Sequence, residues 1–371
     1  VSAALRLGAY ELLWRGTPPY AAVSAWVEVV KGVSGRHAGL VNAVLRRLAR
    51  ATAQGEGASG RTGAAGAVDP ERDLSLPAWL FERFQAALGR EAAVSAALAM
   101  LEPEPLWLTA VREGAEESLL AQGCEVRPGP DLPLPEDAGA GALPRSLSVR
   151  SPVPLADLRA FGDGLVQPQN PASLYAARLL GARAGELVYD LAAGHGVKTA
   201  TLAAAGARVV AVEASAKRAA SAERNLARLG LAAEHVVADL TAGWPPAGTP
   251  AGDRALLDAP CSGTGTLRGH PEIKLRLGPE DVTRLAGLQA QMLRAAARAV
   301  RVEGTLLYAV CSLTPEEGVE RAAAFLEEAP GFAPLPLPAA PGTLLPARVG
   351  AYLLPLRGLD GFYLARFERR S

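Results

Sequence analysis

Short apolar runs alternate with helical segments in the second half of the chain, and this alternation constrains the fold more than any other feature. The runs cover residues 187–191, 208–213, 235–239, 254–258 and 305–311, and segments with helical spacing separate most of them. Strands that alternate with helical crossovers build parallel sheets with helices on both faces. We therefore predict a doubly wound α/β sheet, closed by a late strand over residues 361–367, where polar and apolar side chains alternate.

The first residues of the chain have a different pattern. Apolar side chains recur at helical spacing from residue 5 to residue 50, which predicts an all-α module over residues 1–54. Arg46 and Arg47 lie on the polar side of its last helix, where they can meet RNA phosphates. Residues 55–70 contain many small and few large apolar side chains, as a flexible linker does.

A second small region precedes the alternating pattern. Strand-like stretches at 106–111 and 147–149 flank a helix near 116–122. We expect a small α+β subdomain over residues 71–155, followed by the α/β domain over 156–371.

Composition narrows the class of protein. The chain has 38 basic and 38 acidic residues, and this balance argues against a basic coat over the whole surface. Its three cysteines are widely separated, so we expect neither a disulfide scaffold nor a metal site. No apolar run reaches the roughly 18 residues of a membrane span. We expect a cytoplasmic protein that acts as a monomer.

A turn of small residues follows the first apolar run and leads into a helix. Its residues are Ala192, Ala193, Gly194, His195, Gly196, Val197 and Lys198. Such a turn lets the backbone bend sharply and approach a ligand. A Walker loop needs glycine where Val197 stands, and a dinucleotide fingerprint needs a third glycine near Thr199, so the spacing excludes both.

Acidic residues close successive apolar runs. They are Asp190, Glu213, Asp239 and Asp258. A carboxylate at a strand end can accept hydrogen bonds from a ribose diol, although any one of these residues alone can equally cap a helix. The four together suit a cofactor with a ribose, an amine and a positive sulfonium better than one with phosphates. We therefore predict S-adenosylmethionine as the cofactor.

Two cysteines follow apolar runs in the same half of the chain. Cys261 stands in Asp258-Ala259-Pro260-Cys261-Ser262, and Cys311 stands in Tyr308-Ala309-Val310-Cys311-Ser312. Because parallel strands place ligands at their carboxyl edge, we expect the two thiols to share a site there. Cys124 stands alone, and we expect it to fill apolar space.

Three stretches of sequence resemble a known family, the RsmB (Sun/Fmu) ribosomal RNA cytosine-5 methyltransferases. The stretches are Asp258-Ala259-Pro260-Cys261-Ser262-Gly263, Arg268-Gly269-His270-Pro271-Glu272-Ile273-Lys274 and Cys311-Ser312 followed by Pro315-Glu316-Glu317. At the other end of the chain, residues 7–13 and 41–47 resemble later helices of the family's NusB-like RNA-binding domain. That domain normally begins well upstream of Val1, so we expect a truncated start. The resemblance implies a NusB-like module, a small RRM-like subdomain that binds RNA and a Rossmann-like methyltransferase domain.

The resemblance also implies roles for single residues. Cys311 would attack carbon 6 of the cytosine, Cys261 would assist elimination, and Asp258 would hydrogen-bond the base edge. Sequence alone leaves open which thiol attacks, because DNA cytosine methyltransferases use a Pro-Cys nucleophile that Cys261 mimics locally. The basic residues that would hold RNA phosphates beside the site are Arg268, His270 and Lys274.

Two departures from the family pattern bear on these roles. The cofactor loop of the family usually reads Cys-Ala-Ala-Pro-Gly-Gly-Lys-Thr, and this chain replaces four of the eight residues. Asn170 stands where the family's Gln-Asp-x-x-Ser element has aspartate. The NusB-like start favours small-subunit ribosomal RNA as partner. Transfer RNA as substrate, and a non-catalytic RNA-binding or ribosome-assembly factor, remain as alternatives.

Overall fold

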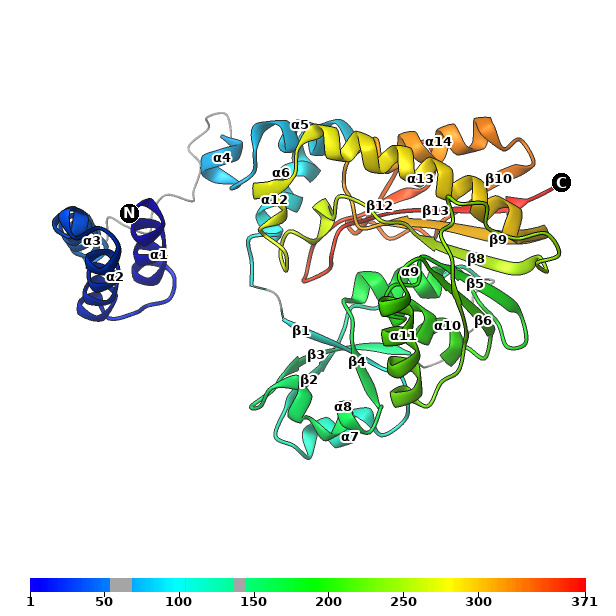
Figure 1. The fold of residues 1–371 in the computed structure, drawn as a ribbon, viewed down its shortest axis with the longest axis horizontal. Coiled ribbons are helices and arrows are strands. Elements are labelled where there is room, and N and C mark those ends of the chain that lie inside the picture. The colour runs from blue at the N-terminus through cyan, green and yellow to red at the C-terminus, as the bar shows by residue number, and fades with distance from the viewer. Residues whose placement is uncertain (54–68, 104, 137–143) are drawn as a thin grey trace. The chain divides into compact units, whose positions relative to one another are not determined.

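The computed structural model describes residues 1–53, 69–103, 105–136 and 144–371 (Figure 1). The chain divides into two compact units, Val1–Asp69 and Pro70–Ser371. Residues 55–68 of the expected linker lie outside the described residues, and its last residue, Pro70, begins a helix.

The first unit is helical, as its apolar spacing predicts. Its elements are α1 (Ser2–Leu13), α2 (Pro19–Ser34), η1 (Gly35–His37) and α3 (Ala38–Ala53). Val23, Val41 and Leu45 are buried between the helices and form the centre of its core. Arg46 and Arg47 lie on the exposed side of α3.

The second unit begins with three helices and a small sheet. The helices are α4 (Pro70–Asp73), α5 (Ala78–Leu88) and α6 (Arg90–Ala99). The sheet has the strand order β2-β3-β1-β4. Its strands are β1 (Leu106–Ala110), β2 (Glu125–Pro128), β3 (Arg145–Arg150) and β4 (Val166–Pro168), and α7 (Ala115–Leu120), η3 (Leu155–Asp157) and α8 (Arg159–Gly162) join them. Cys124 is buried in the apolar core of this subdomain.

The small sheet extends past residue 155, where the sequence analysis ended this subdomain. Its fourth strand, β4, pairs antiparallel with β1. The sequence pattern does not reveal β4 because the strand has only three residues. The buried Leu158, Ala160 and Val166 pack into the core of the subdomain, so the chain up to β4 belongs to it.

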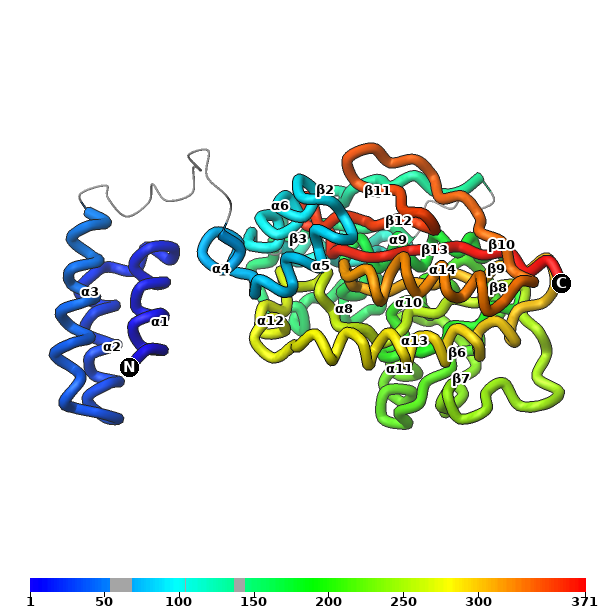
Figure 2. The backbone as a smooth tube through the Cα atoms, turned by 90° about the horizontal axis from the view of Figure 1, so that it is seen from above, coloured from blue at the N-terminus to red at the C-terminus, as the bar shows by residue number. Residues whose placement is uncertain are grey.

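The rest of the unit is an α/β domain built on a nine-stranded sheet. Strands β5 (Leu187–Leu191), β6 (Arg208–Glu213), β7 (Glu234–Val237), β8 (Gly252–Asp258) and β9 (Val300–Val310) are parallel to their neighbours within this set. Strands β11 (Leu344–Pro346), β12 (Ala351–Leu353) and β13 (Phe362–Arg369) continue the sheet antiparallel beyond β9, and β10 (Phe332–Leu335) pairs with β13 (Figure 2). The late strand expected over 361–367 is thus β13, and it lies inside the sheet, between β12 and β9.

Helices cover both faces of this sheet. Figure 1 shows α10 (Val197–Ala204) and α11 (Ala216–Leu229) on one side and α13 (Pro279–Ala299) and α14 (Val319–Glu328) on the other. The remaining helices are α9 (Pro171–Leu179), η4 (Thr264–Thr266) and α12 (Ile273–Arg276). The chain runs from β5 to β6 and β7 on one side, then returns to place β8 on the other side of β5. Such a reversal opens a crevice at the carboxyl ends of the two central strands, where α/β sheets bind ligands.

Polar contacts bind the small sheet to the α/β domain. The buried side chain of Gln167 on β4 donates from Nε2 to the carbonyl of Val197, 3.0 Å away at the start of α10. Arg228 of α11 donates to the carbonyl of Val166 at 3.0 Å, and its guanidinium lies over the Phe161 ring, 4.1 Å from the centroid. The small sheet therefore rests directly on the loop expected to hold the cofactor.

Asn170 is the N-cap of α9 and makes three hydrogen bonds. Its Oδ1 accepts from the backbone N–H groups of Ala172 and Asp360, each at 3.0 Å, and its Nδ2 donates to the carbonyl of Gly358 at 3.1 Å. A carboxylate could not donate the last of these bonds. Asn170 thus accepts two hydrogen bonds, as an aspartate could, and donates a third.

Candidate active site

The cofactor loop connects β5 to α10 and has an unusual backbone. Ala192, Gly194 and Gly196 have φ values of 64°, 58° and 76°, in the left-handed region that favours glycine. A Cβ on Gly196 would lie 2.8 Å from the Cβ of Ala222 on α11, so only glycine lets the loop pass this helix. A Cβ on Gly194 would meet nothing nearer than the Ala192 carbonyl oxygen at 4.0 Å. The backbone at Gly194 therefore has open space for a ligand.

Glu213 closes β6 and supports the cofactor loop. Its buried carboxylate accepts hydrogen bonds from Gly194 N at 3.0 Å, from Ser215 N at 2.8 Å and from Arg218 Nη2 at 2.6 Å. Burial raises the pKa of Glu213, but these hydrogen bonds outweigh it and the net shift is downward. Glu213 is therefore an anion that holds the loop at Gly194.

Asp190, at the end of β5, is fully enclosed. Thr199 donates a hydrogen bond to its Oδ2 at 2.6 Å, whereas its buried Oδ1 has no hydrogen-bond partner among the described residues. Burial raises the pKa of Asp190 to about 7. An unpartnered buried oxygen at a strand end can serve a ligand donor.

Asp239 differs from the other acidic residues. β7 ends at Val237, so Asp239 lies two residues past the strand, and its side chain is exposed. Its Oδ1 accepts from Thr241 N at 2.8 Å and from Thr241 Oγ1 at 2.7 Å. These hydrogen bonds lower the pKa of Asp239. Asp239, which the sequence analysis placed at the end of a strand, is thus an anion in the loop that follows β7.

Lys198 and Asp258 form an ion pair between the cofactor loop and the end of β8. Lys198 Nζ lies 2.6 Å from Asp258 Oδ2 and 5.5 Å from the centroid of the Phe362 ring. Burial lowers the pKa of Lys198, but the charge of Asp258 and its hydrogen bond reverse the shift and raise it. Lys198 is therefore a cation paired with Asp258, and its charge also interacts with Cys311.

The thiols of Cys261 and Cys311 meet at the same edge of the sheet, 3.2 Å apart. Both cysteines are free and partly buried. The hydrogen bond with Cys311, burial and the nearby Glu317 carboxylate raise the pKa of Cys261 well above its usual value. The fold thus brings the two thiols together at the carboxyl edge of the sheet, where the sequence analysis expects them.

The basic residues after Cys261 fall into two groups. His270 is exposed, and Lys274 is partly buried, with its Nζ donating to Ser75 Oγ at 3.0 Å. Arg268 is different, because its side chain is only 1% exposed and donates to the carbonyl of Pro355 at 2.8 Å. This corrects the expectation that Arg268 holds RNA phosphate: the guanidinium is enclosed and ties the loop to the chain before β13.

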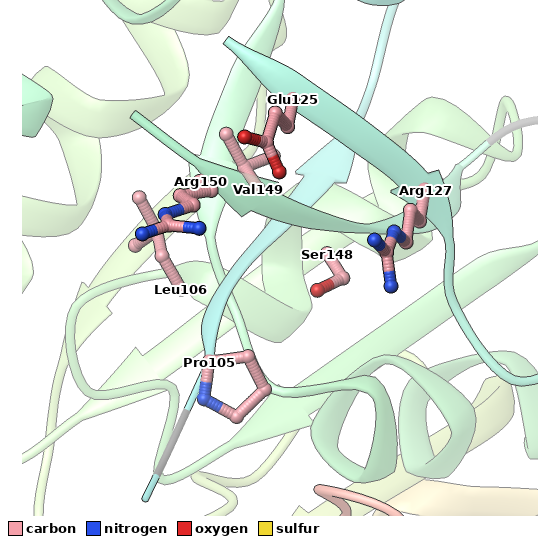
Figure 3. A pocket seen from close by; sticks show the side chains of 7 residues that line it. All are labelled: Pro105, Leu106, Glu125, Arg127, Ser148, Val149 and Arg150. Atoms are coloured by element: carbon pink, nitrogen blue, oxygen red, sulfur yellow. The ribbon is translucent and has the colours of Figure 1, made fainter. Parts of the chain in front are cut away.

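A separate shallow pocket lies on the small sheet (Figure 3). It contains two exposed arginines on neighbouring strands, Arg127 on β2 and Arg150 on β3, and cross-strand neighbours pair Arg127 with Ser148 and Glu125 with Arg150. Its lining residues are Pro105, Leu106, Glu125, Arg127, Ser148, Val149 and Arg150. The sequence analysis expected RNA binding in this subdomain but singled out neither arginine.

A buried polar cluster behind the cysteines also escaped the sequence analysis. Ser262, Ser312 and Gln289 donate to the carboxylate of Glu317. A signal was present, because Ser262 and Ser312 directly follow the two cysteines and Glu317 lies six residues after Cys311. The apolar and turn patterns of the sequence cannot show that these side chains meet.

Together, the fold and the site define a methyltransferase that uses S-adenosylmethionine. The open backbone at Gly194, the unpartnered Asp190 oxygen and the Glu213 carboxylate fit this cofactor, whose amine and ribose hydroxyls are hydrogen-bond donors. A family model for the 16S rRNA methyltransferase RsmB/F matches residues 177–368, and a model for the NusB family matches residues 1–50. The chain belongs to the RsmB/F family of 16S ribosomal RNA methyltransferases.

Individual relatives agree with this assignment. The chain is 43% identical over 366 residues to ribosomal RNA small subunit methyltransferase B of Thermus thermophilus, a match that covers 98% of this chain and 79% of the relative. Two solved structures from Pyrococcus horikoshii share the fold at lower identity. A methyltransferase homologue has a TM-score of 0.66 and 23% identity, covering 83% of this chain and 100% of its own. NSun6, determined with SFG, has a TM-score of 0.65 and 20% identity, covering 80% and 98%.

Two further properties of the described residues concern membranes and metals. In that part of the chain, no helix is long and apolar enough to cross a membrane. The same residues contain no group of three or more histidine, cysteine, aspartate or glutamate side chains arranged to hold a metal ion.

Proposed function

We propose that this enzyme methylates carbon 5 of a cytidine in small-subunit (16S) ribosomal RNA through a covalent bond between Cys311 and carbon 6 of the base. The observation that carries the proposal is the meeting of two thiols, 3.2 Å apart, beside the ion pair of Lys198 and Asp258. The name of the 43% identical relative supports the choice of substrate.

The chemistry of the base explains why a thiol is needed. Carbon 5 of cytosine is a poor nucleophile until a thiolate adds to carbon 6 and raises the electron density at carbon 5. The bound cofactor supplies a methyl group on a positive sulfur. After carbon 5 has taken the methyl group, a base removes the carbon 5 proton and passes it to solvent. The electron pair of that C–H bond restores the double bond as the bond to carbon 6 breaks and Cys311 leaves as a thiolate. Asp258 accepts a hydrogen bond from the protonated ring nitrogen of the adduct.

The raised pKa of Cys261 supports the division of roles between the thiols. At neutral pH a thiol with such a pKa stays protonated, and a protonated thiol is a poor nucleophile. This agrees with the roles that the resemblance to the family implies, in which Cys311 is the attacking group and Cys261 assists the elimination that frees the product. Lys198 stabilises the negative charge that develops around the site.

A base within a stem cannot reach the strand ends, so the target nucleotide lies in a loop or is turned out of its stack. His270 and Lys274 lie on the segment that follows Cys261 and contact neighbouring phosphates. Arg46 and Arg47 of α3 and Arg127 and Arg150 of the small sheet add phosphate contacts elsewhere on the RNA. With this substrate the enzyme works in the cytoplasm, as a monomer.

Bisulfite sequencing of small-subunit ribosomal RNA tests the proposal. Cells that lack the protein should lose one 5-methylcytosine, which the wild-type chain restores and the Cys311→Ala variant does not. In parallel, the Cys261→Ala variant should accumulate a covalent RNA adduct on denaturing gels, because it attacks the base but releases the product slowly. An adduct formed by Cys311→Ala would overturn the assignment of the nucleophile.

The two alternatives predict different results in the same experiment. An unchanged ribosomal pattern with a lost 5-methylcytosine in transfer RNA would move the reaction to transfer RNA. A non-catalytic factor would leave both RNAs unchanged. The assembled thiols and the intact pair of Lys198 and Asp258 favour catalysis.

A further inference from the structure

Glu317 is a fully buried carboxylate directly behind the two cysteines. Its Oε1 accepts hydrogen bonds from Ser262 N at 2.8 Å and from Gln289 Nε2 at 3.0 Å. Its Oε2 accepts from the hydroxyls of Ser262 at 2.5 Å, Ser312 at 2.6 Å and Thr314 at 3.1 Å. Both carboxylate oxygens are therefore saturated by donors of the protein itself.

These bonds join the two segments that carry the thiols. Ser262 directly follows Cys261, and Ser312 directly follows Cys311, although the two serines are 50 residues apart in sequence. Glu317 binds both serines through the same oxygen atom. The position of each thiol is therefore coupled to the other through one carboxylate.

A second layer of side chains fixes Glu317 in turn. Gln289 of α13 donates to the carbonyl of Pro260 at 2.9 Å as well as to Glu317. The hydroxyl of Tyr308 donates to the carbonyl of Glu317 at 2.7 Å and lies 3.1 Å from Gln289 Oε1. Glu317 is thus held from α13 through its carboxylate and from β9 through its backbone carbonyl.

Burying the Glu317 carboxylate costs hydration free energy, and its hydrogen-bond partners indicate what the carboxylate does at this position. The donors to the Glu317 carboxylate described above are a backbone N–H, a side-chain amide and three hydroxyls, all uncharged, and their hydrogen bonds compensate the lost hydration. An apolar residue would fill the same space without this cost. What an apolar residue cannot do is hold the Ser262 and Ser312 hydroxyls at a fixed separation.

We infer that Glu317 is a positioning residue that sets the separation of the Cys261 and Cys311 thiols by binding Ser262 and Ser312 together. The effect of this positioning on the reaction rate rests on the proposed function, in which both thiols act on the same base. A displacement of about 1 Å at a reacting group can cost roughly 100-fold in rate. Because the Glu317 carboxylate is fully enclosed and bonded to donors of the protein, we expect it to act on turnover and to leave cofactor binding unchanged.

Chemical cross-linking tests the separation without relying on the methylation reaction. Dibromobimane becomes fluorescent when it bridges two nearby thiols, and peptide mapping identifies the bridge between Cys261 and Cys311. We expect Glu317→Ala to slow bridging by about tenfold or more and Ser312→Ala to slow it by a smaller factor, since a loosened pair meets less often. The matched control is Glu316→Ala, because the neighbouring Glu316 pairs with Arg83 of α5 and not with the thiol segments.

Turnover provides the second readout. For Glu317→Ala we expect kcat for RNA methylation to fall by about 100-fold while KM for S-adenosylmethionine stays at the wild-type value. Glu317→Gln, which keeps the shape and one acceptor oxygen, should recover part of both bridging and kcat. If Glu317→Ala does not fold, Ser312→Ala and Glu317→Gln carry the test, because neither leaves a large cavity.

The outcomes separate this inference from the proposed function. Wild-type bridging rates in the folded Glu317 and Ser312 variants would overturn the positioning role, whatever the activity. Slowed bridging confirms that role even if the enzyme acts on a different RNA or base. A raised KM for S-adenosylmethionine with unchanged bridging would also reject it, since the residue would then act on the cofactor loop.

Discussion

The Sγ atoms of Cys261 and Cys311 lie 3.2 Å apart at the ends of neighbouring strands β8 and β9, and both thiols are free. An oxidant that accepts two electrons and two protons can therefore join them without a large movement. We expect diamide to form a disulfide between the two residues, to stop methyl transfer, and dithiothreitol to restore it. Non-reducing peptide mapping and an activity assay on the same samples check this.

The matched control is Cys261→Ala. In this variant Cys124 is buried in another core, so diamide should produce no intramolecular disulfide. Full activity in a completely oxidised wild-type sample would contradict the requirement for free thiols.

The raised pKa of Cys261 predicts its reactivity with pH. A thiol reacts with iodoacetamide as the thiolate, so alkylation of Cys261 should remain slow at neutral pH and rise only at strongly alkaline pH. Because the hydrogen bond with Cys311 is the largest cause of the shift, Cys311→Ala should move the alkylation profile of Cys261 toward lower pH. Mass-spectrometric mapping of the Cys261 peptide across the pH range measures both profiles, and identical profiles would speak against the hydrogen bond.

Asp190 predicts a pH-dependent stability. Its folded pKa of about 7 lies above the ordinary aspartate value of 3.8, so between these values the folded state holds a proton that the unfolded state has released. The stabilisation from this proton is present at low pH and is lost as pH rises to about 7. The Asp190→Asn variant keeps an acceptor for Thr199 and does not titrate. Its free energy of unfolding should therefore increase relative to that of the wild type as pH rises from 5 to about 8. Urea unfolding at several pH values measures this difference, and a constant difference would rule out the titration.

Two glycines of the cofactor loop predict different costs for the same substitution. Both have positive φ, but a Cβ on Gly196 would lie 2.8 Å from Ala222 Cβ, whereas one on Gly194 would enter open space. Gly194→Ala should cost about 1 kcal/mol of stability from the backbone alone, and Gly196→Ala about 1–3 kcal/mol more from overpacking. Both should weaken binding of S-adenosylmethionine. Thermal unfolding and isothermal titration measure the two effects, and equal losses of stability would contradict the contact with Ala222.

Arg268 and Lys274 predict opposite results in stability and RNA binding. Loss of the enclosed Arg268 guanidinium leaves the Pro355 carbonyl unpaired, so Arg268→Ala should lower stability by about 1–3 kcal/mol. Lys274→Ala should leave stability nearly unchanged and lower the slope of log affinity for RNA against log salt by about one. Urea unfolding and RNA titrations at several salt concentrations check both. A stable Arg268→Ala with the larger salt effect would restore Arg268 as a phosphate contact.

The sequence predicts the long, regular parts of this fold because their apolar runs are continuous. The runs at 187–191 and 208–213 coincide with β5 and β6, and the run at 254–258 ends with β8 at Asp258. In the small sheet, the sequence predicted β1 and β3 but not β2 and β4, because β2 is mostly exposed and β4 is three residues long. Such strands exist because their neighbours pair with them, which no local pattern reports.

Within the site, motif and resemblance located the thiols, Lys198 and Asp258, which the fold brings together. They did not distinguish exposed from enclosed basic residues, since Arg268 and His270 stand two positions apart in one stretch. They also gave Glu317 no role, because its partners Ser262 and Gln289 are far from it in sequence. The roles of the individual site residues remain predictions, and the variants above test them.

The hydrogen bond from Gln167 to Val197 ties the small sheet to the cofactor loop, and the hydrogen bond from Arg228 to Val166 ties it to α11. These contacts fix the position of the small sheet relative to the α/β domain. We therefore expect the RNA to change its conformation on binding, and to lose base stacking for each nucleotide that enters the site. With the proposed substrate, a nucleotide in a flexible loop therefore reaches the thiols at a lower cost in stacking than one in a folded stem.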